Sequence, residues 1–515
     1  MDTKALRQKI LDLAIRGKLV PQDPNDEPAS VLLERIREQK KQMVKEGKLK
    51  SKDIKNDSVI FVGEDSLHYE KFQDGTVKCI EDEIPFEVPE GWEWCRLNSV
   101  VDVRDGTHDT PAYVDKGIPL ITSKNLIEGG IDYSNVKYIS EEDAFGINER
   151  SGVNVGDILF AMIGTIGNPS MVTEDILISI KNVALFKFSF SDNLNNYFIM
   201  HYLDYAQEDM KKRPSGGLQP FVSLNFLRTY LVPIPPVEEQ HRIVSILTDS
   251  IDSIRNIDIL KNDLAISLEK AKSKILDLAI RGKLVTQDPN DEPASVLLER
   301  IHAEKEELIK QGKIKRDKKE SIIFRGDDNS YYLDEFNEVT LPFDIPDNWI
   351  WVSHNELYEI SGGSQPPKSK FSDVMKENYV RLYQIRDYGE HPVPVYIPEK
   401  LASKKTKKGD ILLARYGASL GKVFWAEDGA YNVAMAKVEA KFLNGILPEY
   451  MFYFYHSRIY KECIFSVSRT AQAGFNKEDL NNLYIPLPPL EEQKRIILQV
   501  SSVLSKLDII SNTLL

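Results

Sequence analysis

Cysteine, long apolar runs and positive charge are all scarce in this chain. Its 515 residues include three cysteines, Cys79, Cys95 and Cys463, and their separations match no metal-ligand spacing. Three cysteines cannot build a disulfide framework, so we expect a reducing compartment. We find no run of about 18 apolar residues, and the charged, amphipathic segment MDTKALRQKILDL is unlike a signal peptide. The sequence therefore predicts a cytoplasmic protein that does not enter a membrane.

The chain also lacks the excess of lysine and arginine that is typical of a free-standing nucleic-acid binder. Its formal net charge is −13, whereas neutralisation of phosphates by basic side chains supplies most non-specific affinity for DNA. Charge acts locally, however, and two basic strips follow predicted helices, at 47–55 (GKLKSKDIK) and 310–319 (KQGKIKRDKK). Each strip is either a solvated linker or a phosphate contact.

Signatures of catalysis are absent as well. The sequence has no P-loop, no G-x-S-x-G, no H-E-x-x-H and no glycine-rich dinucleotide fingerprint. Its eight histidines show no ligand spacing. Asp428, Glu439 and Lys441 form a nuclease-like trio, but Phe186 and Phe188 stand at the places that match Glu439 and Lys441 in the first half of the chain. We therefore predict a non-catalytic chain without a metal site.

What the chain does have is a copy of itself. Residues 10–36 and 275–301 are the same 27-residue string with one substitution, Pro21 against Thr286. Further along, the two copies agree only in short motifs: 84–94 with 341–351, 156–161 (GDILFA) with 409–414 (GDILLA), and 232–243 with 485–496. Uneven divergence is expected if one part meets the same partner twice while another part meets two different targets.

A long helix is predicted between the copies. Residues 238–280 contain no proline or glycine, Pro235 and Pro236 precede them, and Gly282 stands where a helix-ending glycine is expected. Apolar residues recur along this segment at alternating steps of four and three, which favours a coiled-coil partner. The N-terminal and C-terminal stretches together match this segment, so the chain is circularly organised. We expect both terminal helices to align antiparallel to the central helix, with the chain ends close together.

A second helix is predicted after each repeat, within DPNDEPASVLLERI. Asp26 and Asp291 are its expected N-caps, with Pro28 and Pro293 in the first turn.

Two mixed segments, 84–236 and 341–489, contain short apolar runs separated by Gly, Asn, Asp and Pro, which is typical of α/β domains with irregular β structure. The aromatic stretches 196–205 and 449–457 fall at matching positions in them. We interpret each as a buried helix, with a base-stacking platform as the alternative.

Taken in order, these motifs resemble the specificity subunit of type I restriction-modification systems. The resemblance covers the whole chain and rests on the duplicated repeat, the tryptophans that begin each domain (Trp92, Trp94, Trp349 and Trp351), DGTHDTPAY at 105–113, the two GDIL turns and the two PP-V/L-EEQ segments. The second domain departs from the first because GGSQPP (362–367) replaces DGTHDTP. Equivalent DNA contacts therefore cannot be assumed there.

The resemblance implies a mixed α+β fold in which an antiparallel pair of long coiled-coil helices separates two α/β target-recognition domains with pseudo-two-fold, circular organisation. The implied parts are an N-terminal helical region (1–56), target-recognition domain 1 (84–236), a central helical region (237–320), target-recognition domain 2 (341–489) and a C-terminal helix (490–515). Each domain would read one half of a bipartite, asymmetric site in double-stranded DNA, and the helices would set the spacer between the half-sites.

The resemblance also implies the partners. Two modification (methyltransferase) subunits would dock on the helical regions, and restriction (endonuclease and translocase) subunits would complete the complex. S-adenosylmethionine would bind the modification subunits, and ATP with Mg²⁺ the restriction subunits, so this chain itself is expected to hold no cofactor. The near-identity of the repeats is explained either by two identical docking partners or by symmetric packing of the two arms.

Base reading requires hydrogen-bonding side chains on loops that reach a groove of the duplex. In the first domain the candidates are Thr107, His108, Thr110, Lys124, Asn125, Lys181, Asn182, Arg213, Ser215 and Gln219. In the second they are Ser364, Gln365, Lys368, Arg381, Gln384, Arg386, Arg415, Tyr416, Arg469, Gln472 and Asn476. The alternative function is a tandem-repeat coiled-coil adaptor that binds proteins rather than DNA, which the acidic composition would suit.

Overall fold

The computed structural model describes residues 2–51, 54–191, 193–213, 220–314, 323–327, 330–334, 337–442, 445–467 and 474–514. The chain divides into two compact units, residues 1–260 and 261–515, and one helix continues through the boundary. Across these described ranges, no helix is both long enough and apolar enough to cross a membrane.

Unit 1 contains both helices of the N-terminal region and the first mixed domain. Its helices are α1 (Thr3–Ile15), α2 (Ala29–Lys45), α3 (Leu97–Val100), α4 (Glu141–Ser151), α5 (Asn196–Lys212), α6 (Leu224–Thr229) and the first part of α7 (Val237–Ile280). Its strands are β1 (Ser58–Val62), β2 (His68–Phe72), β3 (Val77–Cys79), β4 (Glu93–Arg96), β5 (Asp102–Asp105), β6 (Tyr113–Val114), β7 (Ile118–Thr122), β8 (Leu126–Ile127), β9 (Gly130–Ile131), β10 (Lys137–Ile139), β11 (Ile158–Ala161), β12 (Gly167–Met171), β13 (Ser179–Lys181), β14 (Val183–Lys187) and β15 (Leu231–Ile234).

Two four-stranded sheets form the centre of the first domain, in the orders β12-β11-β14-β5 and β13-β7-β10-β6. The first sheet is antiparallel throughout, whereas β13 and β7 of the second run parallel. All four residues of strand β11 are buried. Successive side chains of a strand point to opposite faces of the sheet, so β11 contributes to two cores. Ile158 and Phe160 enter the core shared with the helices, and Leu159 and Ala161 enter the core shared with the second sheet. The domain therefore has three layers, of helices, first sheet and second sheet.

Unit 2 repeats this plan. Its helices are the remainder of α7, α8 (Ala294–Lys310), α9 (His354–Leu357), α10 (Pro448–His456), α11 (Arg458–Val467) and α12 (Leu490–Leu514). Its strands are β16 (Phe324–Arg325), β17 (Tyr331–Asp334), β18 (Asn337–Val339), β19 (Ile350–Ser353), β20 (Tyr358–Gly362), β21 (Tyr379–Tyr383), β22 (Tyr396–Pro398), β23 (Lys405–Thr406), β24 (Ile411–Ala414), β25 (Val423–Trp425), β26 (Gly429–Tyr431), β27 (Met435–Ala440) and β28 (Tyr484–Leu487).

The first sheet of unit 2, β20-β27-β24-β25, has the same connectivity as its counterpart in unit 1. The second sheet, β22-β21-β26-β23, keeps the parallel pair and one neighbour, but its fourth strand lies at the opposite edge. Three strands of the second sheet are thus common to both domains, and the fourth is particular to each. The two mixed α/β domains predicted from the sequence are confirmed.

Helix α7 confirms the predicted central helix. Its end is a Schellman motif: Gly282 has φ of 66°, its N–H donates to the carbonyl of Ala279 (3.2 Å), and the Lys283 N–H donates to Leu278 (2.8 Å). The predicted apolar seam has two polar positions, Ser250 and Lys261, and it is buried at Ile243, Leu247, Ile254 and Leu268. Ile251, next to Ser250, is buried as well.

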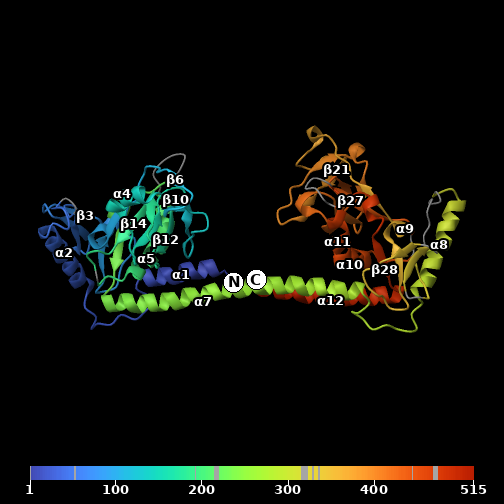
Figure 1. Cartoon of the computed structure of the whole chain (residues 1–515), viewed down its shortest axis with the longest axis horizontal. Coiled ribbons are helices and arrows are strands. Elements are labelled where there is room, and N and C mark those ends of the chain that lie inside the picture. The colour runs from blue at the N-terminus through green and yellow to red at the C-terminus, as the bar shows by residue number, and fades with distance from the viewer. Residues whose placement is uncertain are drawn as a thin grey trace. The chain divides into compact units, whose positions relative to one another are not determined.

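The terminal helices lie antiparallel to α7, each within its own unit (Figure 1). In unit 1, Thr3 donates to Asp258 (2.7 Å), while Gln22 lies at the other end of the contact, against Glu239. In unit 2, Lys272 pairs with Asp508 (2.9 Å), and Gln287 donates to Glu492 (2.6 Å). Proximity of the chain ends, which belong to different units, stays a prediction.

The predicted caps of the second helices are wrong. The N-cap positions of α2 and α8 are occupied by Pro28 and Pro293, which therefore precede the first turn, and no side chain caps either helix. Asp26 instead accepts from Arg242 (2.6 Å). Asp291 accepts from Arg495 at the same distance, 2.6 Å. Each aspartate forms a bond between segments that are far apart in the chain, which local spacing does not reveal.

A small sheet in each unit was not predicted. Strands β1, β2 and β3 form an antiparallel meander beside domain 1, and β16, β17 and β18 form its counterpart. In unit 1, Ile60 and Ile80 of this region pack on Trp94 and Leu231 of the domain. The meander therefore covers the strands with which the domain begins and ends.

Both aromatic stretches lie in buried helices, α5 and α10, as predicted. Beside α10, His354 is fully buried, and its Nε2 lies 2.7 Å from the Tyr455 hydroxyl. The equivalent place in unit 1 is Leu97, because the Leu97 N–H donates to Tyr230 (2.9 Å) as the His354 N–H donates to Leu483 (2.8 Å). Unit 1 thus has an apolar side chain where unit 2 has a histidine.

We predict that this histidine makes unit 2 sensitive to acid. Burial lowers the pKa of His354 to about 4, from an ordinary value of 6.5. Between pH 6.5 and pH 4, His354 is protonated in the unfolded chain and neutral in the folded chain. About 3 kcal/mol of stability, fully present above pH 6.5, is therefore lost as the pH falls to 4. Urea titrations across this range should show a weaker pH dependence for the double variant His354→Leu, Tyr455→Leu. Parallel pH profiles for the variant and the unaltered chain would contradict the prediction.

Candidate DNA-recognition surface

In domain 1, several loops meet at one edge of the first sheet. The last residue of β11, Ala161, pairs with the first residue of β14, Val183, and the next residue of β14, Ala184, pairs with Asp105 at the end of β5. The loops that follow β5 and β11 therefore lie beside the turn that precedes β14. Thr107 and Lys181 also form an isolated parallel bridge across this edge.

Five of the predicted contact residues come together at this edge. The Thr107 N–H donates to Ile180 (3.0 Å), and the Asn182 N–H donates to Thr107 (3.1 Å). His108 lies between Asn182 Oδ1 (2.9 Å from Nδ1) and Asp105 Oδ2 (3.0 Å from Nε2). Lys181 donates to the Thr110 hydroxyl. These exposed or half-buried polar groups, with His108 63% exposed at its side chain, form a surface that a ligand could approach.

Lys124 lies next to this group, whereas Asn125 faces the interior. The Ser123 hydroxyl donates to the Asn182 carbonyl (3.2 Å), which places exposed Lys124 beside the cluster. Asn125 is buried, accepts from the Thr122 N–H (3.0 Å) and donates to the Asp132 carbonyl (3.2 Å). Its amide stabilises a turn in the interior, so the structure gives Asn125 a role in the fold and does not support a base contact there.

Of the remaining candidates of domain 1, Arg213 is the C-cap residue that ends α5. Arg213 is exposed and its Nε donates to Asp209 (3.1 Å). Within the described residues, no hydrogen bond or ion pair joins Arg213 to the five candidates around Thr107. Ser215 and Gln219 lie outside the described residues.

Domain 2 builds the same edge with different side chains. The Gly363 N–H donates to Met435 (3.0 Å), as the Gly106 N–H donates to Val183 (3.0 Å), and the Ser364 N–H donates to Tyr431 (3.2 Å), as that of Thr107 donates to Ile180. A Cβ on Gly106 would lie 2.2 Å from the carbonyl oxygen of Ile180, and one on Gly363 would lie 2.0 Å from that of Asn432. Glycine is therefore required at both places by the close approach of two backbones.

The register of these bonds defines pairs of equivalent residues. Ser364 corresponds to Thr107, Gln365 to His108, Asn432 to Lys181 and Val433 to Asn182. The backbone is thus shared while the side chains differ at each position, which is the arrangement expected for two domains with different targets. Asn432 and Val433 were not predicted, because only the parallel pairing of β26 with β21 places them here.

Arg415 and Tyr416 follow β24 at this edge. Arg415 Nε donates to the Phe475 carbonyl (3.0 Å), and the guanidinium lies over the Tyr416 ring at 5.3 Å. Asn476 is exposed next to this contact, but its side-chain oxygen accepts from the Glu478 N–H (2.9 Å) and so holds a turn. Arg469 and Gln472 lie outside the described residues.

Three further candidates lie within β21 or directly after it. Arg381 Nη2 is 3.1 Å from Asp387, and its guanidinium lies between the rings of Tyr383 and Tyr396. It is mostly buried and stabilises the second sheet. Gln384 is half-buried at the start of a short 3-10 helix, 385–388, whereas Arg386 of that helix is exposed. Arg386 occupies the place of Lys124, since both are the second residue of a 3-10 turn that follows the equivalent strand.

The last two candidates of domain 2, Gln365 and Lys368, are exposed in the segment after β20.

The duplicated motifs form a buried contact at the base of each domain. Glu239 accepts from the Trp92 indole (3.0 Å) and from Gln22 (2.5 Å), and Glu492 accepts from Trp349 (2.9 Å) and from Gln287 (2.6 Å). Burial raises the pKa of both carboxyls. We call each of these three-residue contacts the carboxylate hub. The hub explains why both halves of the chain have a glutamate in the EEQ motif and a tryptophan at the start of the domain: the two side chains are bonded to each other.

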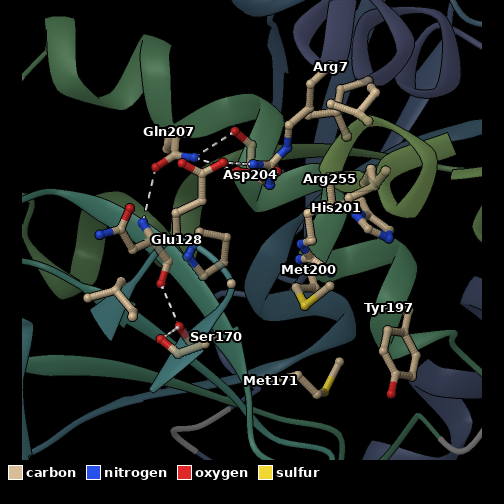
Figure 2. A pocket seen from close by; sticks show the side chains of 18 of the residues that line it. Arg7, Glu128, Ser170, Met171, Tyr197, Met200, His201, Asp204, Gln207 and Arg255 are labelled. Carbon is tan, nitrogen blue, oxygen red and sulfur yellow. Dashed lines mark hydrogen bonds and ion pairs between the residues drawn. The ribbon is translucent and has the colours of Figure 1, made fainter. Parts of the chain in front are cut away.

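A hollow of about 900 Å³ in unit 1 is separate from this surface. It lies between α1, α5, α7, β12 and the β8-β9 hairpin, and none of the predicted contact residues lines it. Figure 2 shows Arg7 pointing toward Asp204, with which it forms an ion pair of 2.8 Å, and Gln207 bonded nearby. Arg7 also pairs with Glu128 of the hairpin. These bonds join α1 to domain 1 across the hollow. We therefore interpret the hollow as a gap between two packed elements.

Comparison with known proteins identifies the class. Residues 89–265 and 346–515 match the family model described as the type I restriction modification DNA specificity domain. These matches cover more than half of the chain and include both sheet edges, so the chain belongs to this family. It is a specificity subunit of a type I restriction-modification system.

The most informative relatives agree with this assignment. The specificity subunit of type I restriction enzyme EcoEI from Escherichia coli is 28% identical, over 96% of this chain and 88% of its own length. That of EcoAI, also from Escherichia coli, is 30% identical, over 72% of this chain and 65% of its own length. One solved structure superposes on this chain with a TM-score of 0.56. It is described as the structural basis underlying complex assembly and conformational transition of the type I R-M system. It is 21% identical and the match covers 84% of this chain and 94% of that one, which supports the fold.

Proposed function

We propose that each domain of this chain reads one half of a bipartite, asymmetric site in double-stranded DNA, through the loops at the edge of its first sheet. The supporting observation is that the two domains share the backbone bonds of this edge and differ in the side chains that it presents. A shared backbone gives both domains the same approach to a duplex, and different side chains give two different half-sites.

We further propose that the repeats and helices α1, α7 and α12 carry two modification subunits. The hub contact joins a tryptophan to a glutamate in both units. The surface around it therefore occurs twice with nearly the same residues. S-adenosylmethionine would bind the modification subunits, ATP and Mg²⁺ the restriction subunits, and this chain would supply recognition without chemistry. The partners would also supply the positive field that a chain of net charge −13 lacks.

The direct experiment is reconstitution. The chain is co-expressed with the modification subunit of its own system, and the purified complex is tested for methylation of genomic DNA, followed by sequencing of the methylated positions. We expect one gapped motif with two unlike halves. A stable complex that methylates no defined motif would reject the proposal and favour the adaptor function.

Exchange of one domain should change one half of the motif only. Replacing residues 341–489 with the matching segment of another family member leaves the hub residue Glu492 and all of unit 1 unaltered. Because the domain begins and ends on the paired strands β19 and β28, the transplanted segment retains its own closure. We expect the half-site read by domain 2 to change completely and the other to stay the same. Changes in both halves would contradict modular reading.

A further inference from the structure

A buried aspartate, Asp105, holds two exposed side chains at this edge of the first sheet in domain 1. Asp105, at the end of β5, is 6% exposed. One of its carboxylate oxygens pairs with Arg150, at the C-terminal end of α4, and the other lies 3.0 Å from His108 Nε2. The side chain of Arg150 is 66% exposed, so its guanidinium is fixed on one side and open to solvent on the other.

Domain 2 has no carboxylate at this place and has an arginine instead. By the register of the first sheet, the residue equivalent to Asp105 is Gly362: Asp105 pairs with Ala184 of β14, and Gly362 pairs with Ala436 of β27. A Cβ on Gly362 would lie only 2.8 Å from Nη1 of Arg415. The absence of a side chain at Gly362 thus lets the Arg415 guanidinium reach the end of the edge strand, where its Nε donates to the Phe475 carbonyl (3.0 Å).

The two domains therefore bring an arginine to the same point of the same sheet edge by different routes. In domain 1 it comes from α4 and is held by a carboxylate, and in domain 2 it follows β24 and is held by a carbonyl. A guanidinium held by a fixed acceptor keeps its remaining N–H groups in a rigid fork. Such a fork fits the O6 and N7 acceptors of guanine in the major groove.

We propose that Arg150 and Arg415 each read a guanine, one in each half of the DNA site, and that Asp105 is the positioning residue for Arg150. This inference rests on the proposed function. It adds Arg150, a residue that the sequence did not indicate, and it assigns to Arg415 a role that matches the role of Arg150. A positioned guanidinium can discriminate between bases, whereas a lysine at the same place keeps the charge without the planar fork.

The test is selection of DNA by the reconstituted modification complex. The probe is a pool of duplexes in which both half-sites are randomised, and the bound fraction is sequenced. With Arg150→Lys, we expect the preference for guanine at one position of one half-site to fall by roughly 10- to 100-fold, with the other half-site unchanged. Arg415→Lys should give the corresponding loss in the other half-site. Asp105→Asn should weaken the preference at the Arg150 position, because the guanidinium loses its charged acceptor.

The controls separate this inference from the proposed function. Arg458 is an exposed arginine of domain 2 that also pairs with a carboxylate, that of Glu462 (2.6 Å), so Arg458→Lys should leave both half-sites unchanged. If the unaltered complex selects no motif, the proposed function fails. If it selects a motif and Arg150→Lys selects the same motif with undiminished preference, Arg150 reads no base. A loss of affinity that is equal for all sequences after Arg150→Ala, with full preference retained by Arg150→Lys, would make the arginine a phosphate contact and would also overturn the inference.

Discussion

Replacing Gly17 or Gly282 with alanine is expected to destabilise the corresponding unit by about 2 to 5 kcal/mol. These glycines end α1 and α7 with φ of 63° and 66°, in the left-handed region that disfavours a side chain. A Cβ on Gly17 would also lie 2.3 Å from Pro89 Cγ, and one on Gly282 would lie 2.5 Å from Pro346 Cγ. Both costs therefore act together, since the backbone is strained and the domain must move away from the helix. Urea titration of the full chain, with tryptophan fluorescence as the signal, measures the loss.

The chain contains matched controls for this substitution. Gly47 and Gly312 end α2 and α8 with φ of 74° and 67°, but a Cβ on either would meet no atom within 4 Å. Gly47→Ala and Gly312→Ala should therefore cost only the backbone strain, about 1 to 2 kcal/mol. Equal losses at Gly17 and Gly47 would show that contact between the repeat and the domain contributes nothing.

Removing the carboxylate of either hub is expected to cost about 2 to 4 kcal/mol. Glu239→Ala leaves the Trp92 indole as a buried donor without an acceptor, removes the bond from the exposed Gln22 amide, and opens a cavity. Glu492→Ala should have the same effect in unit 2, because Trp349 and Gln287 make the same bonds there. Chemical denaturation of each variant gives the loss, and a blue or red shift of tryptophan emission in the folded state reports whether the indole has been repacked.

The neighbouring glutamates serve as controls for the hubs. Glu238 and Glu491 lie in the same first helical turns but are exposed. Their replacement by alanine removes a favourable interaction with the helix dipole and, at Glu491, an exposed ion pair with Lys494 (2.6 Å), so we expect a loss of about 0.3 to 1 kcal/mol. Losses of similar size for Glu238→Ala and Glu239→Ala would mean that the hub is not a stabilising contact.

The sequence predicted those parts of the fold that depend on local pattern or on repetition. The long helix ending before Gly282 and the two buried aromatic helices follow from residues close together in the chain. Asp26 was misassigned because its partner, Arg242, is 216 residues away and nothing in the spacing of either residue indicates the other. The meander β1-β2-β3 was missed because its strands are short and partly polar, and its apolar residues are explained only by the domain surface that they cover.

The candidate site shows the same division. The loop DGTHDTP was recognised as a motif, and most of its polar residues do lie together. Lys181 and Asn182 join them because β13 runs parallel to β7, a pairing that single-sequence patterns do not specify. The sequence predicted a base contact at Asn125, but both ends of its amide form hydrogen bonds within a turn. Arg150 belongs to no sequence motif, and its ion pair with Asp105 joins residues 45 positions apart that no spacing connects.

The pairing of β4 with β15, and of β19 with β28, brings the two ends of each domain into hydrogen-bonding contact. A block of chain whose ends meet can be removed and replaced without stretching what lies outside it. Natural selection can then preserve the junction while the intervening segment drifts or is exchanged whole by recombination between related genes. A specificity subunit built in this way can change one recognition domain in a single step, because the paired strands at the junction and the helices outside it stay the same.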